Sequence, residues 1–162
     1  MNRKFLVGAL TPLILGMGAA WAGSLEEGVA AHQRGEFAAA AAAFGALAEE
    51  GNPAAQYNLA QMYRQGQGVA RDYAQAAKWY RLAASQGDAP SQYNLGVMYF
   101  NAQGVPPNLV LSHMWLTLSA AAGVENATRN RAMLTKQMTP EQIVEALQLA
   151  RECKQRDFKA CD

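Results

Sequence analysis

The chain of 162 residues contains only two histidines, which are the side chains best suited to acid–base or metal chemistry near neutral pH. His32 and His113 fall in different helical patterns. Neither lies four residues from another histidine or inside a cluster of carboxylates, as a metal site on a helix would require. Ser112 precedes His113, but adjacent residues of a helix point to different faces, so the two are not a nucleophile and its base. The sequence therefore predicts no catalytic residues, no metal site and no cofactor.

Two cysteines, Cys153 and Cys161, are the other residues with their own chemistry. Continuous helix would hold their Cα atoms about 12 Å apart, whereas a disulfide requires less than roughly 7 Å. A bridge thus requires the last helix to end between them, and residues 156–158 are where we expect that turn. A disulfide follows if the protein is exported to an oxidising compartment. The alternative is two free thiols at a frayed end.

The first 22 residues have the three regions of a secretory signal peptide. Arg3 and Lys4 form a short basic start, an apolar run follows, and the sequence AWA at residues 20–22 is a small-x-small site for cleavage before Gly23. The alternative is an uncleaved anchor helix, which Pro12 and the glycines of the run disfavour. We therefore expect cleavage, no stable membrane anchor afterwards, and a periplasmic or secreted protein.

Composition restricts the class of the remaining chain. Without Arg3 and Lys4, the chain has 12 basic and 13 acidic side chains, and no run of basic residues remains. Such a protein lacks the electrostatic surface that nucleic-acid binding needs. The whole sequence is 51% hydrophobic and 17% charged, which is typical of a globular domain. We expect one domain over residues 23–162 and no nucleic-acid partner.

A repeat of 36 residues organises the middle of this domain. The sequence QYNLAQMY at residues 56–63 aligns with QYNLGVMY at residues 92–99, and the GV pair at residues 68–69 falls on that at residues 104–105. A fixed period between 20 and 50 residues is typical of a solenoid.

Each period contains two helical patterns. In the first copy, apolar residues recur at helical spacing after Pro53, and a second apolar pattern begins after Asp72, a typical N-cap, and ends at Gly87. The two patterns predict a helical hairpin. Successive hairpins give repeats at residues 52–87 and 88–123.

Shorter helical patterns flank the two repeats. SLEE at residues 24–27 is a capping box that begins a hairpin over residues 23–51, and TPEQ at residues 139–142 is a second one within capping helices over residues 124–162. No strand pattern is present. The sequence therefore predicts an all-α, right-handed α/α solenoid of helical hairpins, with about seven helices after the signal peptide.

The core QYNLGxMYxxxxGV, the tryptophan of the second helix and the ending AAxxG resemble Sel1-like repeats, relatives of tetratricopeptide repeats. The resemblance covers residues 25–152, and the first hairpin is closer to the tetratricopeptide form because it lacks the long glycine-rich loop. MTPEQ is similar to the C-terminal helix of many bacterial members. Ala102 replaces the first loop glycine in the second copy. Arg131 falls in the column of Leu95, so the third unit is not a full repeat.

By analogy with tetratricopeptide arrays, the first helix of each repeat would line a concave groove that binds a peptide or protein segment. Carboxamides bond to a peptide backbone, and rigid aromatic rings supply contact area. For each residue alone, the alternative is packing between repeats. The predicted groove residues are Tyr57, Asn58, Gln61, Arg64, Tyr93, Asn94, Val97 and Phe100.

Three functions are compatible with this scaffold. One is a protein–protein interaction scaffold or regulator in the bacterial periplasm, and another is a structural module that docks on a larger assembly. The remaining one is an enzyme, since cysteine-rich Sel1-like proteins have been associated with β-lactam binding and hydrolysis. Those members carry a cysteine pair in most repeats, whereas this chain has only the terminal pair. We therefore expect a non-enzymatic protein with a protein or peptide partner.

Overall fold

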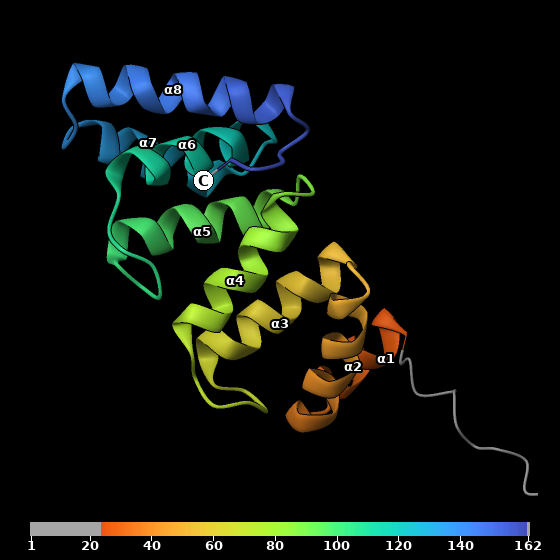
Figure 1. The fold of residues 1–162 in the computed structure, drawn as a ribbon. Coiled ribbons are helices and arrows are strands. Elements are labelled where there is room, and N and C mark those ends of the chain that lie inside the picture. Colours follow the sequence, from red (N-terminus) through yellow and green to blue (C-terminus); the bar gives the residue numbers. More distant parts are fainter. Residues whose placement is uncertain (1–23, 162) are drawn as a thin grey trace, which may run out of the picture.

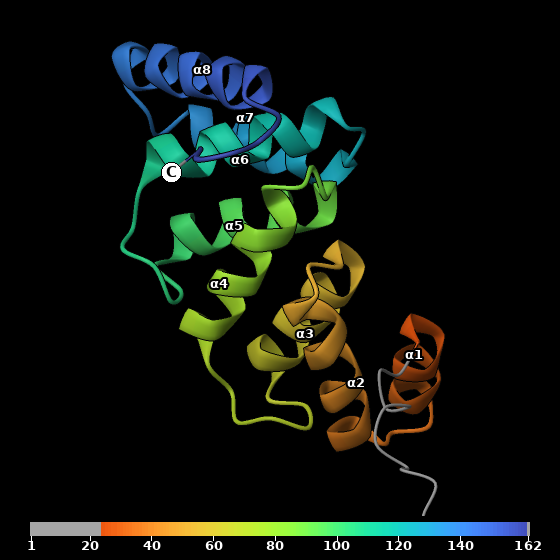
Figure 2. The same ribbon diagram turned by 45° about the vertical axis from the view of Figure 1, so that its right-hand side comes forward.

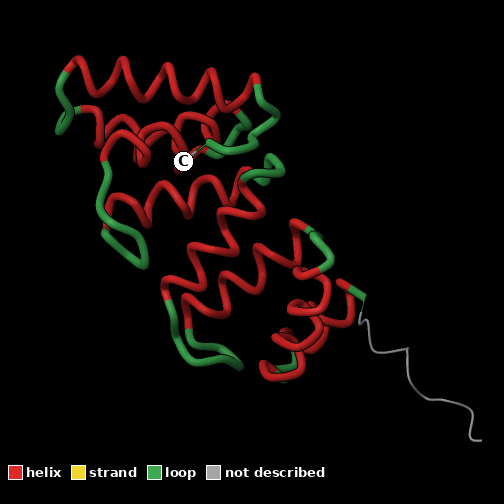
Figure 3. Tube along the Cα trace, in the orientation of Figure 1, coloured by secondary structure: helices red, strands yellow, loops and turns green. Residues whose placement is uncertain are grey.

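The computed structural model describes residues 24–161; the predicted signal peptide at residues 1–22 lies outside them. Within the described range the chain forms eight helices and no strand, close to the seven or so expected (Figures 1 and 3). The prediction of an all-α stack of helical hairpins is confirmed. The helices are α1 (Leu25–Gln33), α2 (Phe37–Glu49), α3 (Pro53–Gln65), α4 (Tyr73–Ala84), α5 (Ala89–Asn101), α6 (Leu109–Ala121), α7 (Glu125–Thr135) and α8 (Pro140–Gln155).

The hairpins follow one another along a single column, with α1 and α2 at one end and α8 at the other (Figures 1 and 2). Helices α1 and α2, α3 and α4, and α5 and α6 pair with each other, and the second helix of each pair also packs on the first helix of the next. Helix α8 packs on α6 and covers that end of the column. No helix between residues 24 and 161 has both the length and the apolar character needed to span a bilayer.

Local signals determine where the helices begin. Both predicted capping boxes are present. In the first, the Glu27 amide donates to the Ser24 hydroxyl at 3.2 Å and the Ser24 amide donates to the Glu27 carboxylate at 3.0 Å. Thr139 and Gln142 make the same reciprocal pair before α8. Side-chain caps of this kind satisfy amide groups that the helix itself leaves unpaired, so the helix starts are encoded locally.

The GV pairs of the repeat mark a close approach between neighbouring hairpins. Gly68 and Gly104 both have positive φ, of 70° and 69°. A Cβ atom on Gly104 would overlap the backbone carbonyl of Tyr73 at the start of α4, and one on Gly68 would overlap that of Phe37 at the start of α2. Only glycine combines this backbone conformation with such proximity. The loop of each repeat is thereby packed on the preceding hairpin.

The C-terminal tail turns back where the sequence predicts. Helix α8 ends at Gln155, and Asp157 and Phe158 adopt left-handed conformations with φ of 50° and 63°. The turn brings the Cα atoms of Cys153 and Cys161 to 5.0 Å, and the two residues form a disulfide. Both are buried in the main core, so the bridge fastens the tail to the column.

Removing this bridge should weaken the fold. We expect a Cys153→Ala, Cys161→Ala double variant to lose about 2 to 3 kcal/mol of unfolding free energy, because the short loop it closes then adds entropy to the unfolded chain. Urea denaturation with and without dithiothreitol measures the loss. The reductant should shift the wild-type midpoint and leave that of the variant unchanged; an unshifted wild type would contradict this role of the bridge.

Candidate functional site

In the first repeat, three of the four predicted groove residues, Tyr57, Gln61 and Arg64, form a hydrogen-bond network with Tyr80. Gln61 is the centre: its Oε1 accepts from the Tyr80 hydroxyl at 2.6 Å and from Arg64 Nη2 at 2.8 Å, and its Nε2 donates to the Tyr57 hydroxyl at 2.9 Å. The rings of Tyr57 and Tyr80 lie 6.0 Å apart. Burial raises the pKa of Tyr80, so its hydroxyl stays protonated and able to donate. This four-residue network fills the space between α3 and α4.

The second repeat has apolar residues at most of the corresponding positions, and there a cavity of about 350 Å³ opens. Tyr93, Val97, Phe100 and Leu116 lie 36 residues after Tyr57, Gln61, Arg64 and Tyr80. Val97 has no group that donates a hydrogen bond, so no equivalent network forms. The Tyr93 hydroxyl instead accepts from Asn130 Nδ2 of α7 at 3.2 Å.

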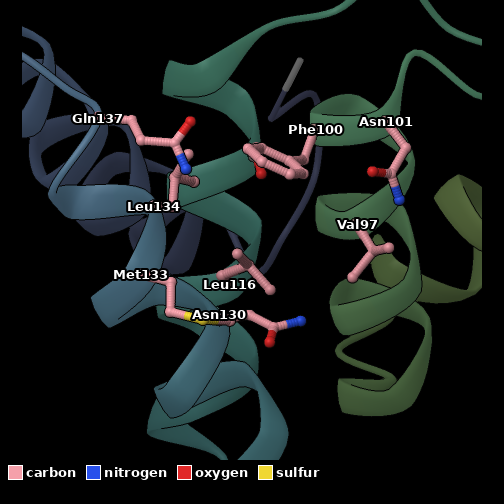
Figure 4. Close-up of a pocket in the computed structure, with 9 residues that line it drawn as sticks. Val97, Phe100, Asn101, Leu116, Asn130, Met133, Leu134 and Gln137 are labelled. Carbon is pink, nitrogen blue, oxygen red and sulfur yellow. The ribbon is translucent and has the colours of Figure 1, made fainter.

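Three helices surround the cavity, as Figure 4 shows. Val97 and Phe100 belong to α5, Met133 and Leu134 to α7, and Leu116 of α6 lies between them. Phe100 is 43% exposed and Met133 58%, so two large apolar side chains border the opening. The full lining consists of Val97, Phe100, Asn101, Ser112, Leu116, Asn130, Met133, Leu134 and Gln137.

The polar residues of this lining are carboxamides and one serine. Asn101, Asn130 and Gln137 each carry both a donor and an acceptor. The Ser112 hydroxyl is used inside the fold, since it donates to the Gly96 carbonyl at 2.7 Å. Within residues 24–161, no charged side chain lines the cavity. Its chemistry is thus that of a neutral apolar pocket with carboxamides, suited to binding rather than to proton transfer.

Asn58 and Asn94 lie on the same helices but outside the cavity lining. Their Nδ2 atoms donate to the carbonyls of Ala54 and Pro90, each at 2.9 Å and each four residues earlier in the same helix. Of the eight predicted groove residues, the structure brings only Val97 and Phe100 into the cavity.

Three lining residues in α7 and just after it were missed from the sequence although a signal was present. Asn130, Met133 and Gln137 lie 36 residues after Asn94, Val97 and Asn101. The register therefore continues into α7. The charged residue in the column of Leu95 obscured it, because a charge at a core position argues against a further repeat. We call the surface of α3, α5 and α7 that carries these columns the first-helix face.

The two histidines are in separate structural surroundings. His113 is buried, with Nε2 3.2 Å from the Thr135 hydroxyl and Nδ1 3.3 Å from that of Thr117. His32 Nε2 lies 3.2 Å from Oε1 of Gln67. Among the described residues, no three histidine, cysteine or carboxylate side chains are grouped so that they could hold a metal ion. Each histidine thus contacts a polar side chain of the next hairpin, Gln67 for His32 and Thr135 for His113.

Burial, and secondarily Arg131, lowers the pKa of His113. Below pH 6.5, the ordinary value for histidine, the unfolded chain then binds more protons than the folded one, so this residue makes stability fall with falling pH. We expect unfolding free energy to drop between pH 7 and pH 5, and less steeply in His113→Gln. Urea midpoints at the two pH values measure both slopes; equal slopes in the two proteins would disprove this contribution.

Comparison with known proteins places these hairpins in a family. Residues 53–88 and 89–124 each match the model of the Sel1 repeat. No curated protein matches the chain. A protective antigen present in uropathogenic Escherichia coli strains, which displays an SLR fold, is 29% identical with a TM-score of 0.78, covering 85% of this chain and 30% of the antigen.

A Sel1 repeat protein from Oxalobacter formigenes is also 29% identical, with a TM-score of 0.64, and the match covers 68% of this chain and 45% of that one. The chain thus spans less than half the length of either structure. The repeat matches, the repeated sequence columns and the stacked hairpins agree with one another. The chain therefore contains two Sel1 repeats between residues 53 and 124, and its fold is similar to that of Sel1 repeat proteins.

Proposed function

We propose that the chain is an exported interaction module that binds a protein or peptide segment on its first-helix face. Sel1 repeats generally act as protein-interaction scaffolds. The observation that carries the proposal is the apolar cavity between α5 and α7, bordered by the half-exposed Phe100 and the exposed Met133. Exposed apolar side chains around a concave pocket are typical of a binding site, since they are costly to leave in water.

Photo-crosslinking in living cells tests this proposal. A benzoylphenylalanine at Phe100 should give a covalent adduct with one partner protein, whereas the same residue at Ala42, which is exposed on α2, should not. Mass spectrometry of the adduct identifies the partner and its segment. Adducts of equal yield at both positions, or none at Phe100, would count against the first-helix face.

Export rests on the three regions of residues 1–22. The protein purified from a cell fractionation should occur in the periplasm or medium and should begin at Gly23 on N-terminal sequencing. Recovery in the cytoplasm with Met1 in place would refute export and leave the binding proposal standing.

Catalysis by a thiol has no support in the described residues, because both cysteines are in the disulfide. We accordingly expect the purified protein to hydrolyse nitrocefin no faster than a buffer blank. Turnover that scales with protein concentration would instead favour the β-lactam alternative.

A further inference from the structure

The cavity arises from substitutions between two otherwise similar repeats. In the first repeat Gln61, Arg64 and Tyr80 fill the space with the network described above. In the second, Val97 and Leu116 replace Gln61 and Tyr80 with side chains that cannot form hydrogen bonds. The surrounding columns, including the QYNL core, are retained. In the first repeat the protein's own side chains fill this space, whereas in the second repeat the space is an open cavity.

The open space suits an apolar side chain. Pockets that hold small molecules measure about 300 to 1,000 Å³, and this one, at about 350 Å³, is at the lower limit. Asn101 and Gln137 offer paired donors and acceptors, which match the amide and carbonyl of a peptide backbone. Met133 is flexible and can adapt to the shape of the inserted group. These features favour an anchoring side chain of a peptide over a rigid polar ligand.

The first-helix face is basic around this opening. The column that contains Phe100 has Arg64 one repeat earlier and Lys136 one repeat later. Arg64 bonds to Gln61 and forms no ion pair with a carboxylate of the described residues. Helix α5 carries no charged side chain, so the apolar opening lies between two cations.

Helix α7 adds further positive charge to the first-helix face. It contains Arg129 and Arg131 and only one carboxylate, Glu125, which pairs with Arg129 at 3.0 Å. Acidic residues of the chain are concentrated elsewhere, for example at Glu49 and Glu50 at the end of α2. The three helices of the face therefore carry an excess of positive charge, although the whole chain is close to neutral. Complementary charge in a partner would steer association to this face.

We propose that the partner segment inserts one large apolar side chain, of leucine, methionine or phenylalanine size, into the cavity and carries acidic residues beside it. This inference rests on the proposed function and specifies its partner. The apolar side chain fills the space between Val97, Leu116 and Met133, and the flanking carboxylates lie within reach of Arg64 and Lys136. The first repeat does not accept such a side chain, because its own network occupies the equivalent space.

Selection from a random heptapeptide display library on the purified protein tests the inference. Enriched peptides should contain a large apolar residue with aspartate or glutamate within three positions. In fluorescence polarisation with a synthetic enriched peptide, changing the apolar residue to alanine should weaken binding about 10- to 100-fold, as expected for the burial of one such side chain. Raising the salt concentration should also weaken binding, since the charges are exposed.

A variant that copies the first repeat into the second is the matched control. Val97→Gln, Phe100→Arg and Leu116→Tyr together should close the cavity and lower affinity at least tenfold. Circular dichroism and thermal melting check that it folds. Should it fail to fold, Phe100→Arg alone replaces a half-exposed side chain and should also lower affinity. Unchanged affinity in a folded variant would overturn the inference.

The outcomes separate this inference from the proposed function. Enriched peptides without an apolar anchor, or with basic flanks, overturn the inference, and so does the absence of any enrichment. If photo-crosslinking at Phe100 nevertheless captures one partner, the proposed function stands and only the chemistry of the segment is wrong. Failure of crosslinking at Phe100 contradicts the function itself. A concentration-dependent dimer that Phe100→Arg dissociates, with no peptide enriched, would overturn the inference and assign the cavity to a second copy of the chain.

Discussion

Replacing Gly104 by alanine should lower the free energy of unfolding by about 3 kcal/mol. The left-handed backbone alone costs an alanine roughly 1 to 2 kcal/mol, and the added Cβ also overlaps the carbonyl of Tyr73, which must shift. Since this carbonyl begins α4, the change disturbs the junction between the two repeats. Urea denaturation followed by circular dichroism measures the loss.

Gly35→Ala is the matched control. Gly35 has a similar φ of 77°, but nothing lies within 4 Å of the position that its Cβ would take. This variant should therefore lose only about 1 to 2 kcal/mol, the cost of the backbone conformation. Equal losses at the two glycines would show that close packing of the loop on α4 contributes nothing, and that the repeated GV pair reflects backbone conformation alone.

Phe100→Asp should lower the affinity for the crosslinked partner about 100-fold while hardly changing stability. The ring is 43% exposed, so the free protein loses little packing, whereas in the complex a buried aromatic anchor is replaced by an unpaired charge. Isothermal titration with the partner segment measures the change.

Leu82→Asp controls for the introduced charge. Leu82 is 39% exposed, but it lies on α4, a second helix of a hairpin, and does not line the cavity. We expect wild-type affinity from it. A comparable loss in both variants would mean that the partner responds to net charge rather than to the cavity.

Much of the fold could be predicted because its signals are local and repeated. Ser24 and Thr139 begin helices through their own side-chain hydrogen bonds. The 36-residue repeat then implies that each hairpin packs on the previous one, so no long-range contact has to be predicted separately. Even the turn between Cys153 and Cys161 was predictable, since a disulfide there excludes a continuous helix.

The cavity was not predictable in the same way, because it depends on side-chain volume that is missing between three helices. The eight predicted residues are four pairs, each occupying the same position of the first helix in the two repeats. The sequence repeat does not distinguish Gln61, which fills its space, from Val97, which leaves space open. Arg131 in the column of a core leucine made α7 look unrelated, although Asn130 and Met133 keep the register. Periodicity identifies the face; only the packed structure shows where it is hollow.

Chemical-shift mapping by NMR with the partner segment found by crosslinking tests the central claim most directly, namely that the first-helix face binds a partner at the cavity. On addition of the segment to isotope-labelled protein, the largest amide shifts should cluster at Val97, Phe100, Asn130, Met133 and Gln137, and α2 and the exposed side of α8 should remain unchanged. Shifts centred on α8 or α2, with the cavity residues unaffected, would contradict the claim.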